Sequence, residues 1–139
     1  QNGISVPLLH IADATGKAIS AKGFSKVGLL GTKYTMEEDF YKKRIFDSFG
    51  IDVTIPDKKD RETINRIIYD ELCLDKILPE SKAAVKNIIS DLNKNGAQGV
   101  ILGCTEIPLI IKEEDTDIPI FNTTKIHALS ITDFALNNI

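Results

Sequence analysis

Short apolar runs rich in β-branched residues alternate along this chain with longer segments whose apolar residues recur at helical spacing. Most of these runs are continuously apolar, which is typical of parallel strands covered on both faces. The runs that we expect to be strands are residues 6–11, 26–30, 51–55, 99–103 and 118–121. Helices between them would supply the crossovers that parallel strands require. The order therefore predicts an α/β protein with a doubly wound parallel sheet of four to five strands flanked by helices.

Signals at the ends of the helices support this interpretation. Thr35, with Glu38 three residues later, matches a capping box, which predicts that Thr35 is the N-cap of a helix that Gly50 ends. Two later segments carry apolar stripes at helical spacing, and each predicts a helix that buries one face against the sheet. The stripes are Ile64, Ile67, Ile68 and Leu72, and then Val85, Ile88, Ile89 and Leu92.

Composition restricts the compartment and the partners. The 139 residues are enough for one ordinary domain with a sizeable core. The net charge is −3 and the densest charged cluster, residues 57–62, mixes both signs, so we expect no nucleic-acid partner. We also expect no membrane partner and no signal peptide, because the apolar runs are short and Gln1–Gly3 has neither a basic nor an apolar region. The two cysteines are interpreted as free thiols in a reducing, cytoplasmic compartment.

Cys104 lies where a buried strand is expected to end and a helix to begin, in the stretch GVILGCTEIPLI. Ligands of open parallel α/β sheets bind outside the carboxyl ends of the strands. The free N–H groups and dipole of a helix beginning near Thr105 would favour a thiolate, lower the pKa of Cys104 and make it a usable base or nucleophile. On this reasoning we expect Cys104 to react with iodoacetamide faster than Cys73 does. The alternative is a buried structural cysteine, and these residues alone leave both possibilities open.

Four stretches together resemble the aspartate/glutamate racemase family, specifically its aspartate racemase-like branch. They are VPLLHIADATGKAI (6–19), KVGLLGTKYTMEEDFYKKRI (26–45), RIIYDELCL (66–74) and GVILGCTEIPLI (99–110). The resemblance implies a cofactor-independent enzyme with two similar α/β domains that each contribute one catalytic cysteine to a central cleft. It also implies a small amino-acid substrate and a homodimer. Cys104 matches the cysteine of the second domain.

The family's first cysteine lies in a segment that would precede Gln1. We therefore expect residues 1–121 to be the second α/β domain of a longer, two-domain protein, and residues 122–139 to form a C-terminal helix that returns toward the first domain. Cys73 is no substitute for the first cysteine, because it lies on an amphipathic helix in a different context. Its role stays open, although some aspartate racemases carry a carboxylate-binding lysine near that place.

The resemblance gives Cys104 the role of one base in a two-base transfer of the substrate Cα proton. Thr105 is expected to hold the substrate carboxylate through its backbone N–H and hydroxyl, and Thr32 and Thr35 are expected to donate from a second loop. For Thr35, helix capping alone is an equal alternative.

Other polar residues receive weaker assignments. Glu106 is interpreted as site support or a helix-dipole contact, and His10 as possible site support or a core histidine. Asp13 is expected to be an N-cap. The spacing of cysteines and histidines fits no zinc site, and we expect no metal. Two functional alternatives remain: a related cysteine-dependent isomerase or decarboxylase of small carboxylates, and an inactive fragment that binds a small anion or a partner.

Overall fold

Four parallel strands form one sheet in the order β2-β1-β3-β4, in a computed structural model that describes the backbone of residues 2–129 and the side chains of residues 11–129. The strands are β1 (Lys26–Leu30), β2 (Asp52–Thr54), β3 (Val100–Leu102) and β4 (Ile120–Asn122). The predicted fold class is confirmed. Strands were correctly expected near all four positions, because continuous apolar runs between turn residues are typical of a covered parallel sheet.

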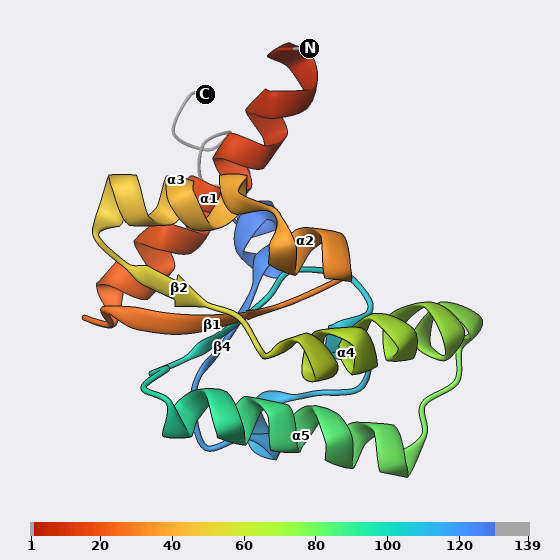
Figure 1. Cartoon of the computed structure of the whole chain (residues 1–139). Helices are drawn as coiled ribbons and strands as arrows, with labels where there is room; N and C mark the ends of the chain where they lie inside the picture. Colours follow the sequence, from red (N-terminus) through yellow and green to blue (C-terminus); the bar gives the residue numbers. More distant parts are fainter. Residues whose placement is uncertain (1, 130–139) are drawn as a thin grey trace.

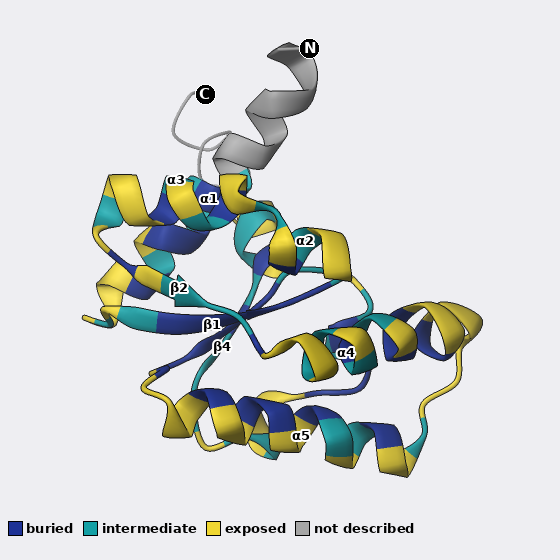
Figure 2. Ribbon diagram, viewed as in Figure 1, coloured by how far each residue is buried: buried dark blue, intermediate teal, exposed yellow. Residues whose placement is uncertain are grey.

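Helices cover both faces of the sheet (Figure 1). α1 (Asn2–Ala21) and α3 (Asp39–Phe49) pack together on one face, and α4 (Lys58–Asp70) and α5 (Pro79–Lys94) lie on the other. Shorter elements join these layers: α2 (Lys33–Glu37) and the 3₁₀ turns η1 (Leu72–Leu74), η2 (Ile107–Leu109) and η3 (Glu113–Asp115). Of the C-terminal helix expected at residues 122–139, residues 123–129 are helical and follow β4 directly, Asn122 belongs to β4, and residues 130–139 lie outside the described residues. Figure 2 shows the consequence for burial: the central strands β1 and β3 are mostly buried, and the helices expose their outer faces.

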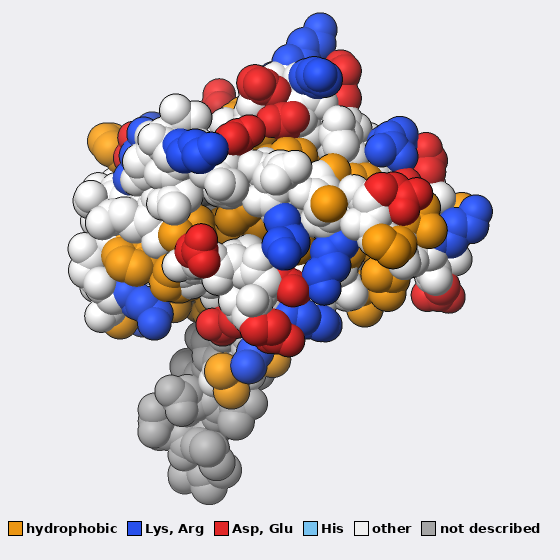
Figure 3. Space-filling view, turned by 90° about the horizontal axis from the view of Figure 1, so that it is seen from below, with side chains coloured by type: hydrophobic (Ala, Val, Ile, Leu, Met, Phe, Trp, Pro, Cys, Tyr) orange, Lys and Arg blue, Asp and Glu red, His pale blue; other side chains and the backbone are white. Residues whose placement is uncertain are grey.

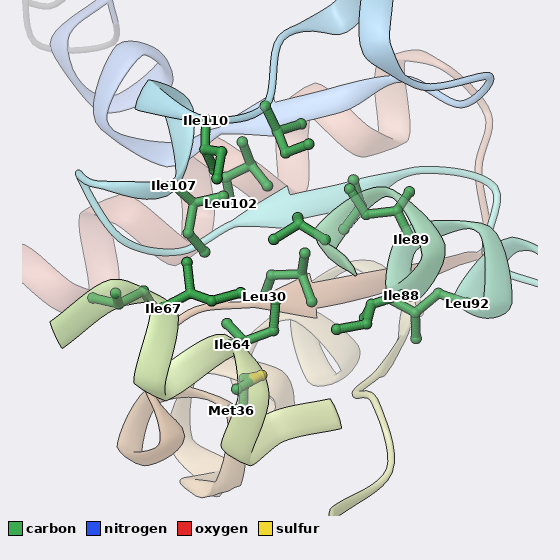
Figure 4. Close-up of a cluster of buried hydrophobic side chains, with 14 of the residues drawn as sticks. Leu30, Met36, Ile64, Ile67, Ile88, Ile89, Leu92, Leu102, Ile107 and Ile110 are labelled. Atoms are coloured by element: carbon green, nitrogen blue, oxygen red, sulfur yellow. The ribbon is translucent and has the colours of Figure 1, made fainter. Parts of the chain in front are cut away.

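Two apolar cores lie on opposite faces of the sheet because side chains alternate along a strand. Val27, Leu29 and Ile101 point to the core under α1 and α3. Leu30 and Leu102 point to the other core, where they meet the predicted stripes of α4 and α5. In Figure 4 Ile107 lies beside Leu102 and Ile67 in this second core. The segment after Cys104 is thus folded back onto the sheet through Ile107, which is 1% exposed.

The expected strand at residues 6–11 is wrong, because these residues belong to α1. A short apolar run does not by itself distinguish a strand from part of a buried helix. The helical assignment follows from residues further along α1, because Ala12, Thr15 and Ile19 are buried at helical spacing and α1 packs against α3. Gly16 allows this close packing, since a Cβ atom there would lie 2.3 Å from two carbons of the Phe49 ring.

The helix cap predicted at Thr35 is also wrong. Thr32 is the N-cap of α2, and its hydroxyl oxygen accepts the N–H of Thr35. The chain then turns to extended backbone at Glu38, whose carboxylate caps α3 by accepting the N–H of Phe40. Two helices therefore replace the one that was expected. The predicted end at Gly50 is confirmed by its left-handed φ of 68°.

The surface that Figure 3 presents carries interspersed positive, negative and apolar side chains. At the centre of this face several Lys and Arg side chains lie close together, with Asp and Glu side chains beside them. Among residues 2–129, none of the helices combines the length and apolar character needed to cross a bilayer.

Candidate functional site

The carboxyl ends of β1 and β3 meet at one edge of the sheet. Leu30 and Leu102 are register partners, and the N–H of Gly103 donates to the carbonyl oxygen of Leu30 across 2.7 Å. The loop that begins at Gly31 and the loop that carries Cys104 therefore start side by side. In parallel α/β proteins this edge is where ligands bind.

Thr35 closes the space between these two loops. A Cβ atom built on Gly31 would come within 3.1 Å of Thr35 Cγ2, and one built on Gly103 within 3.3 Å of the same methyl carbon. Thr35 is thus in contact with the residue that precedes Cys104, although the two loops are far apart in the sequence. Glycine at both strand ends makes this approach possible.

The hydroxyl groups of Thr32 and Thr35 form a pair within the loop that follows β1. Their oxygens are 3.0 Å apart, and Thr32 Oγ1 also accepts the N–H of Thr35 across 3.2 Å. One hydroxyl proton bridges the pair, so the other remains able to donate to a ligand. Capping and ligand binding are therefore compatible in this pair, with Thr32 as the capping residue.

Cys104 is half-buried and packs against the core that contains Leu102 and Ile107. Burial raises the pKa of its thiol, and only partly offsetting contacts come from the backbone N–H groups of Ile107 and Glu106. The negative charge of Glu106 raises that pKa further. The predicted lowering of the Cys104 pKa is wrong for the described chain.

The cause of this difference is the structure that follows Cys104. An α-helix was expected to begin near Thr105, but residues 104–106 form bends and only the three-residue turn η2 follows. Such a turn has no extended row of aligned peptide dipoles, whereas apolar burial acts on the thiol directly. Desolvation of the thiolate consequently raises the pKa of Cys104 by more than the two backbone hydrogen bonds lower it.

Thr105 and Glu106 lie next to Cys104 and contact each other. Thr105 is exposed, and its hydroxyl donates to Glu106 Oε2 across 2.9 Å. Glu106 precedes η2 without capping it through its side chain. The contact assigns Glu106 a local partner, which the sequence alone did not indicate. To bind a ligand, the Thr105 hydroxyl must leave this carboxylate.

The remaining sequence assignments lie elsewhere. The His10 side chain is outside the described residues. Asp13 is not an N-cap: it lies inside α1 and accepts two hydrogen bonds from Arg44 on α3, at 2.9 and 3.0 Å. Cys73 does not lie on the amphipathic helix where it was expected, because α4 ends at Asp70 and Cys73 is exposed in the following turn η1. Within residues 11–129 no group of three or more His, Cys, Asp or Glu side chains is arranged to hold a metal ion.

One residue near the site was missed. Thr123, the first residue after β4, is buried, and its hydroxyl donates to the carbonyl oxygen of Leu102 across 3.0 Å. The signal available from the sequence was its position shortly after the expected strand at residues 118–121. A groove of about 530 Å³ runs along the β4 edge nearby. Leu102, Pro108, Phe121 and Asn122 line part of it, whereas Cys104 is not among its lining residues.

The chain is similar to known racemases in sequence and in structure. The family model described as Asp/Glu/hydantoin racemase matches residues 1–131. A solved structure of a candidate Asp/Glu racemase from Yersinia pestis is 51% identical, with a TM-score of 0.88 over 92% of this chain and 56% of that one. An aspartate racemase homologue from Pyrococcus horikoshii OT3 is 38% identical, with a TM-score of 0.84 over 90% of this chain and 54% of that one.

A glutamate racemase from Shewanella loihica is 27% identical over 112 residues, which cover 79% of this chain and 40% of the relative. The present chain therefore spans about half the length of the two solved structures, and less of this enzyme.

Proposed function

The chain belongs to the Asp/Glu/hydantoin racemase family, and we propose that it contributes one side of the catalytic site of a cofactor-independent amino-acid racemase. The proposed substrate is aspartate or a related small polar amino acid. Similarity to a candidate Asp/Glu racemase and to an aspartate racemase homologue supports this class of substrate. One observation carries the assignment to a site: the loop after β1, which holds the Thr32–Thr35 hydroxyl pair, packs through the Thr35 methyl group against Gly103, the residue before Cys104.

The proposed chemistry is proton exchange at the substrate Cα. A thiolate on one face removes the proton, the carbon passes through a carbanion-like state, and a thiol on the opposite face returns a proton. Cys104 is one of these two groups. Burial raises the pKa of the Cys104 thiol and so favours its protonated form, which is the form that donates. The role reverses with the enantiomer that binds.

Hydroxyl and backbone N–H donors would hold the substrate carboxylate. The free proton of the Thr32–Thr35 pair and the N–H of Thr105 are the proposed donors, and they lie on the two loops that meet at this sheet edge. Hydrogen bonds to the carboxylate stabilise the negative charge that develops when the Cα proton leaves. Thr35 combines this role with packing against both strand-end glycines.

The second acid–base group must approach the substrate from the face opposite Cys104. Cys73 is the only other cysteine in the sequence, and it lies in the exposed turn η1 after α4. We therefore propose that the opposing thiol belongs to a preceding domain of a longer polypeptide, in keeping with the greater length of the solved relatives.

The test is a racemisation assay on the complete polypeptide that carries this chain. L-Aspartate, L-glutamate and uncharged polar amino acids are each incubated in deuterium oxide without added cofactor, and both enantiomers are quantified. Inversion with incorporation of deuterium at Cα, lost in Cys104→Ala, supports the proposal. Carbon dioxide release or cis/trans isomerisation of a diacid, without inversion of any amino acid, assigns the site instead to a related cysteine-dependent reaction.

A further inference from the structure

We propose that Thr123 is a positioning residue for Cys104, acting through the peptide group that precedes the Gly103–Cys104 turn. The effect of Thr123 on turnover rests on the proposed racemase function. The effect of Thr123 on the position of the Cys104 thiol is independent of that function. The Thr123 hydroxyl donates to a backbone carbonyl oxygen and not to the thiol or to a proposed substrate donor. It acts through the backbone.

The peptide group between Leu102 and Gly103 is held at both ends. Its carbonyl oxygen, on Leu102, accepts the Thr123 hydroxyl across 3.0 Å. Its N–H, on Gly103, donates to the Leu30 carbonyl oxygen across 2.7 Å. Because a peptide group is planar, two hydrogen bonds on opposite edges define its orientation. The Cα atom of Gly103, and with it the direction in which the chain continues to Cys104, follows from that orientation.

A glycine makes this restraint important. Gly103 lacks the side chain that would narrow its backbone conformations, so the turn depends on external contacts. Thr35 Cγ2 and Leu29 Cδ1 face the Gly103 Cα from one side. The hydrogen bond from Thr123 supplies a directional restraint from the β4 side, which apolar contacts cannot supply.

The sheet places Thr123 where this hydrogen bond can form. Leu102 and Asn122 are register partners at the ends of β3 and β4, and Thr123 directly follows Asn122. The chain becomes helical at residue 123, so the Thr123 side chain is fixed where the helix and the strand meet. Only 6% of Thr123 is exposed, which keeps water from competing for the Leu102 carbonyl.

The experiment compares Thr123→Val, which keeps the shape and removes the donor, with Thr123→Ser, which keeps the donor. Iodoacetamide alkylation of Cys104 is followed as a function of pH by mass spectrometry of the peptide that contains it. We expect Thr123→Val to change the alkylation rate of Cys104 at a fixed pH by about fivefold or more, and Thr123→Ser to stay within about twofold of wild type, because small displacements of a reacting group have large kinetic effects. If Thr123→Val does not fold, Thr123→Ala removes the same donor without placing a methyl group against the Leu102 carbonyl oxygen, and it is expected to behave alike.

Thr15→Val is the matched control. Thr15 is a fully buried threonine whose hydroxyl oxygen accepts the Tyr41 hydroxyl, and it lies in the α1–α3 layer on the other face of the sheet. Its substitution removes a buried hydrogen bond without touching the Cys104 turn. Unchanged Cys104 alkylation in Thr123→Val and Thr123→Ala, or an equal change in Thr15→Val, overturns the proposal.

A kinetic comparison on the complete polypeptide separates positioning from binding. For Thr123→Val we expect kcat to fall by about 10-fold while KM stays within about twofold, because a displaced thiol slows proton transfer without removing a substrate contact. Thr123→Ser is expected to restore kcat. If the wild-type polypeptide racemises nothing while Thr123→Val still alters Cys104 alkylation, the proposed function fails and the positioning role stands. A rise in KM with unchanged kcat overturns the positioning role.

Discussion

Thr35 lies against Gly103, so the loop after β1 touches the residue that precedes Cys104 in the loop after β3. A Cβ atom on Gly103 would lie 3.3 Å from Thr35 Cγ2, 3.2 Å from Leu29 Cδ1 and 3.2 Å from the Leu30 carbonyl oxygen. The two side chains can shift, but the carbonyl oxygen is part of the sheet. This contact couples the position of the hydroxyl pair to that of the Cys104 turn.

Gly103→Ala is therefore expected to destabilise the fold by about 1–3 kcal/mol, the usual range when a methyl group is forced into a packed site. Thr35 must give way, so the Thr32–Thr35 pair is displaced as well. Urea unfolding measures the first effect, and the KM for the amino-acid substrate of the complete polypeptide measures the second. Stability and KM both equal to wild type would show that this contact is not tight.

The reactivity of the two thiols follows from burial. Burial raises the pKa of Cys104, whereas Cys73 is exposed. Since the thiolate is the nucleophile, we expect Cys104 to be alkylated by iodoacetamide more slowly than Cys73 at neutral pH, with a rate that climbs as pH rises beyond the ordinary cysteine range. This reverses the order that sequence alone predicts. The urea-unfolded chain is the control, in which the two rates should converge, and a faster Cys104 in the folded chain would contradict the burial argument.

Two-base racemisation also makes a prediction about residues 1–139 by themselves. One thiol reaches one face of the substrate carbon, so we expect this polypeptide alone to show no appreciable racemisation. Slow exchange of the Cα proton with deuterium, with retention favoured over inversion, is the activity expected to remain. Chiral chromatography and mass spectrometry follow the two processes, with Cys104→Ala as the control. Substantial inversion that survives Cys104→Ala would refute both the role of Cys104 and the need for an opposing group.

Tyr41 provides a test of the other core. Burial raises the pKa of Tyr41 from 10.0 to about 12, and the hydrogen bond with Thr15 offsets only part of this. A raised phenol pKa means that the folded state holds its proton more tightly, so the associated stability is present below pH 10.0 and is lost as pH rises toward about 12. We expect the phenolate absorbance to show a late component near pH 12 that disappears in Tyr41→Phe. Ionisation of all tyrosines in a single earlier step would contradict this burial.

Much of the architecture was predictable because its signals are local. Continuous apolar runs between turn residues indicated β1, β2, β3 and β4, and the stripes of α4 and α5 indicated the helices that cover one face. The position of Cys104 at a strand end was also predictable. The expected strand at residues 6–11 was wrong because a short apolar run can form either a strand or part of a buried helix. Here the run belongs to α1, which packs against α3.

The site depends on contacts between residues that are distant in the chain. The sequence by itself determined that a cysteine and two threonines follow buried strands. Tertiary structure alone decided that Thr35 meets Gly103, that Thr123 holds the Leu102 carbonyl, and that Cys104 is half-buried with a raised pKa. The physical reason is that strand order and register set which loops meet, and burial sets the free energy of the charged thiolate. Both arise only when the whole sheet and its cores are assembled.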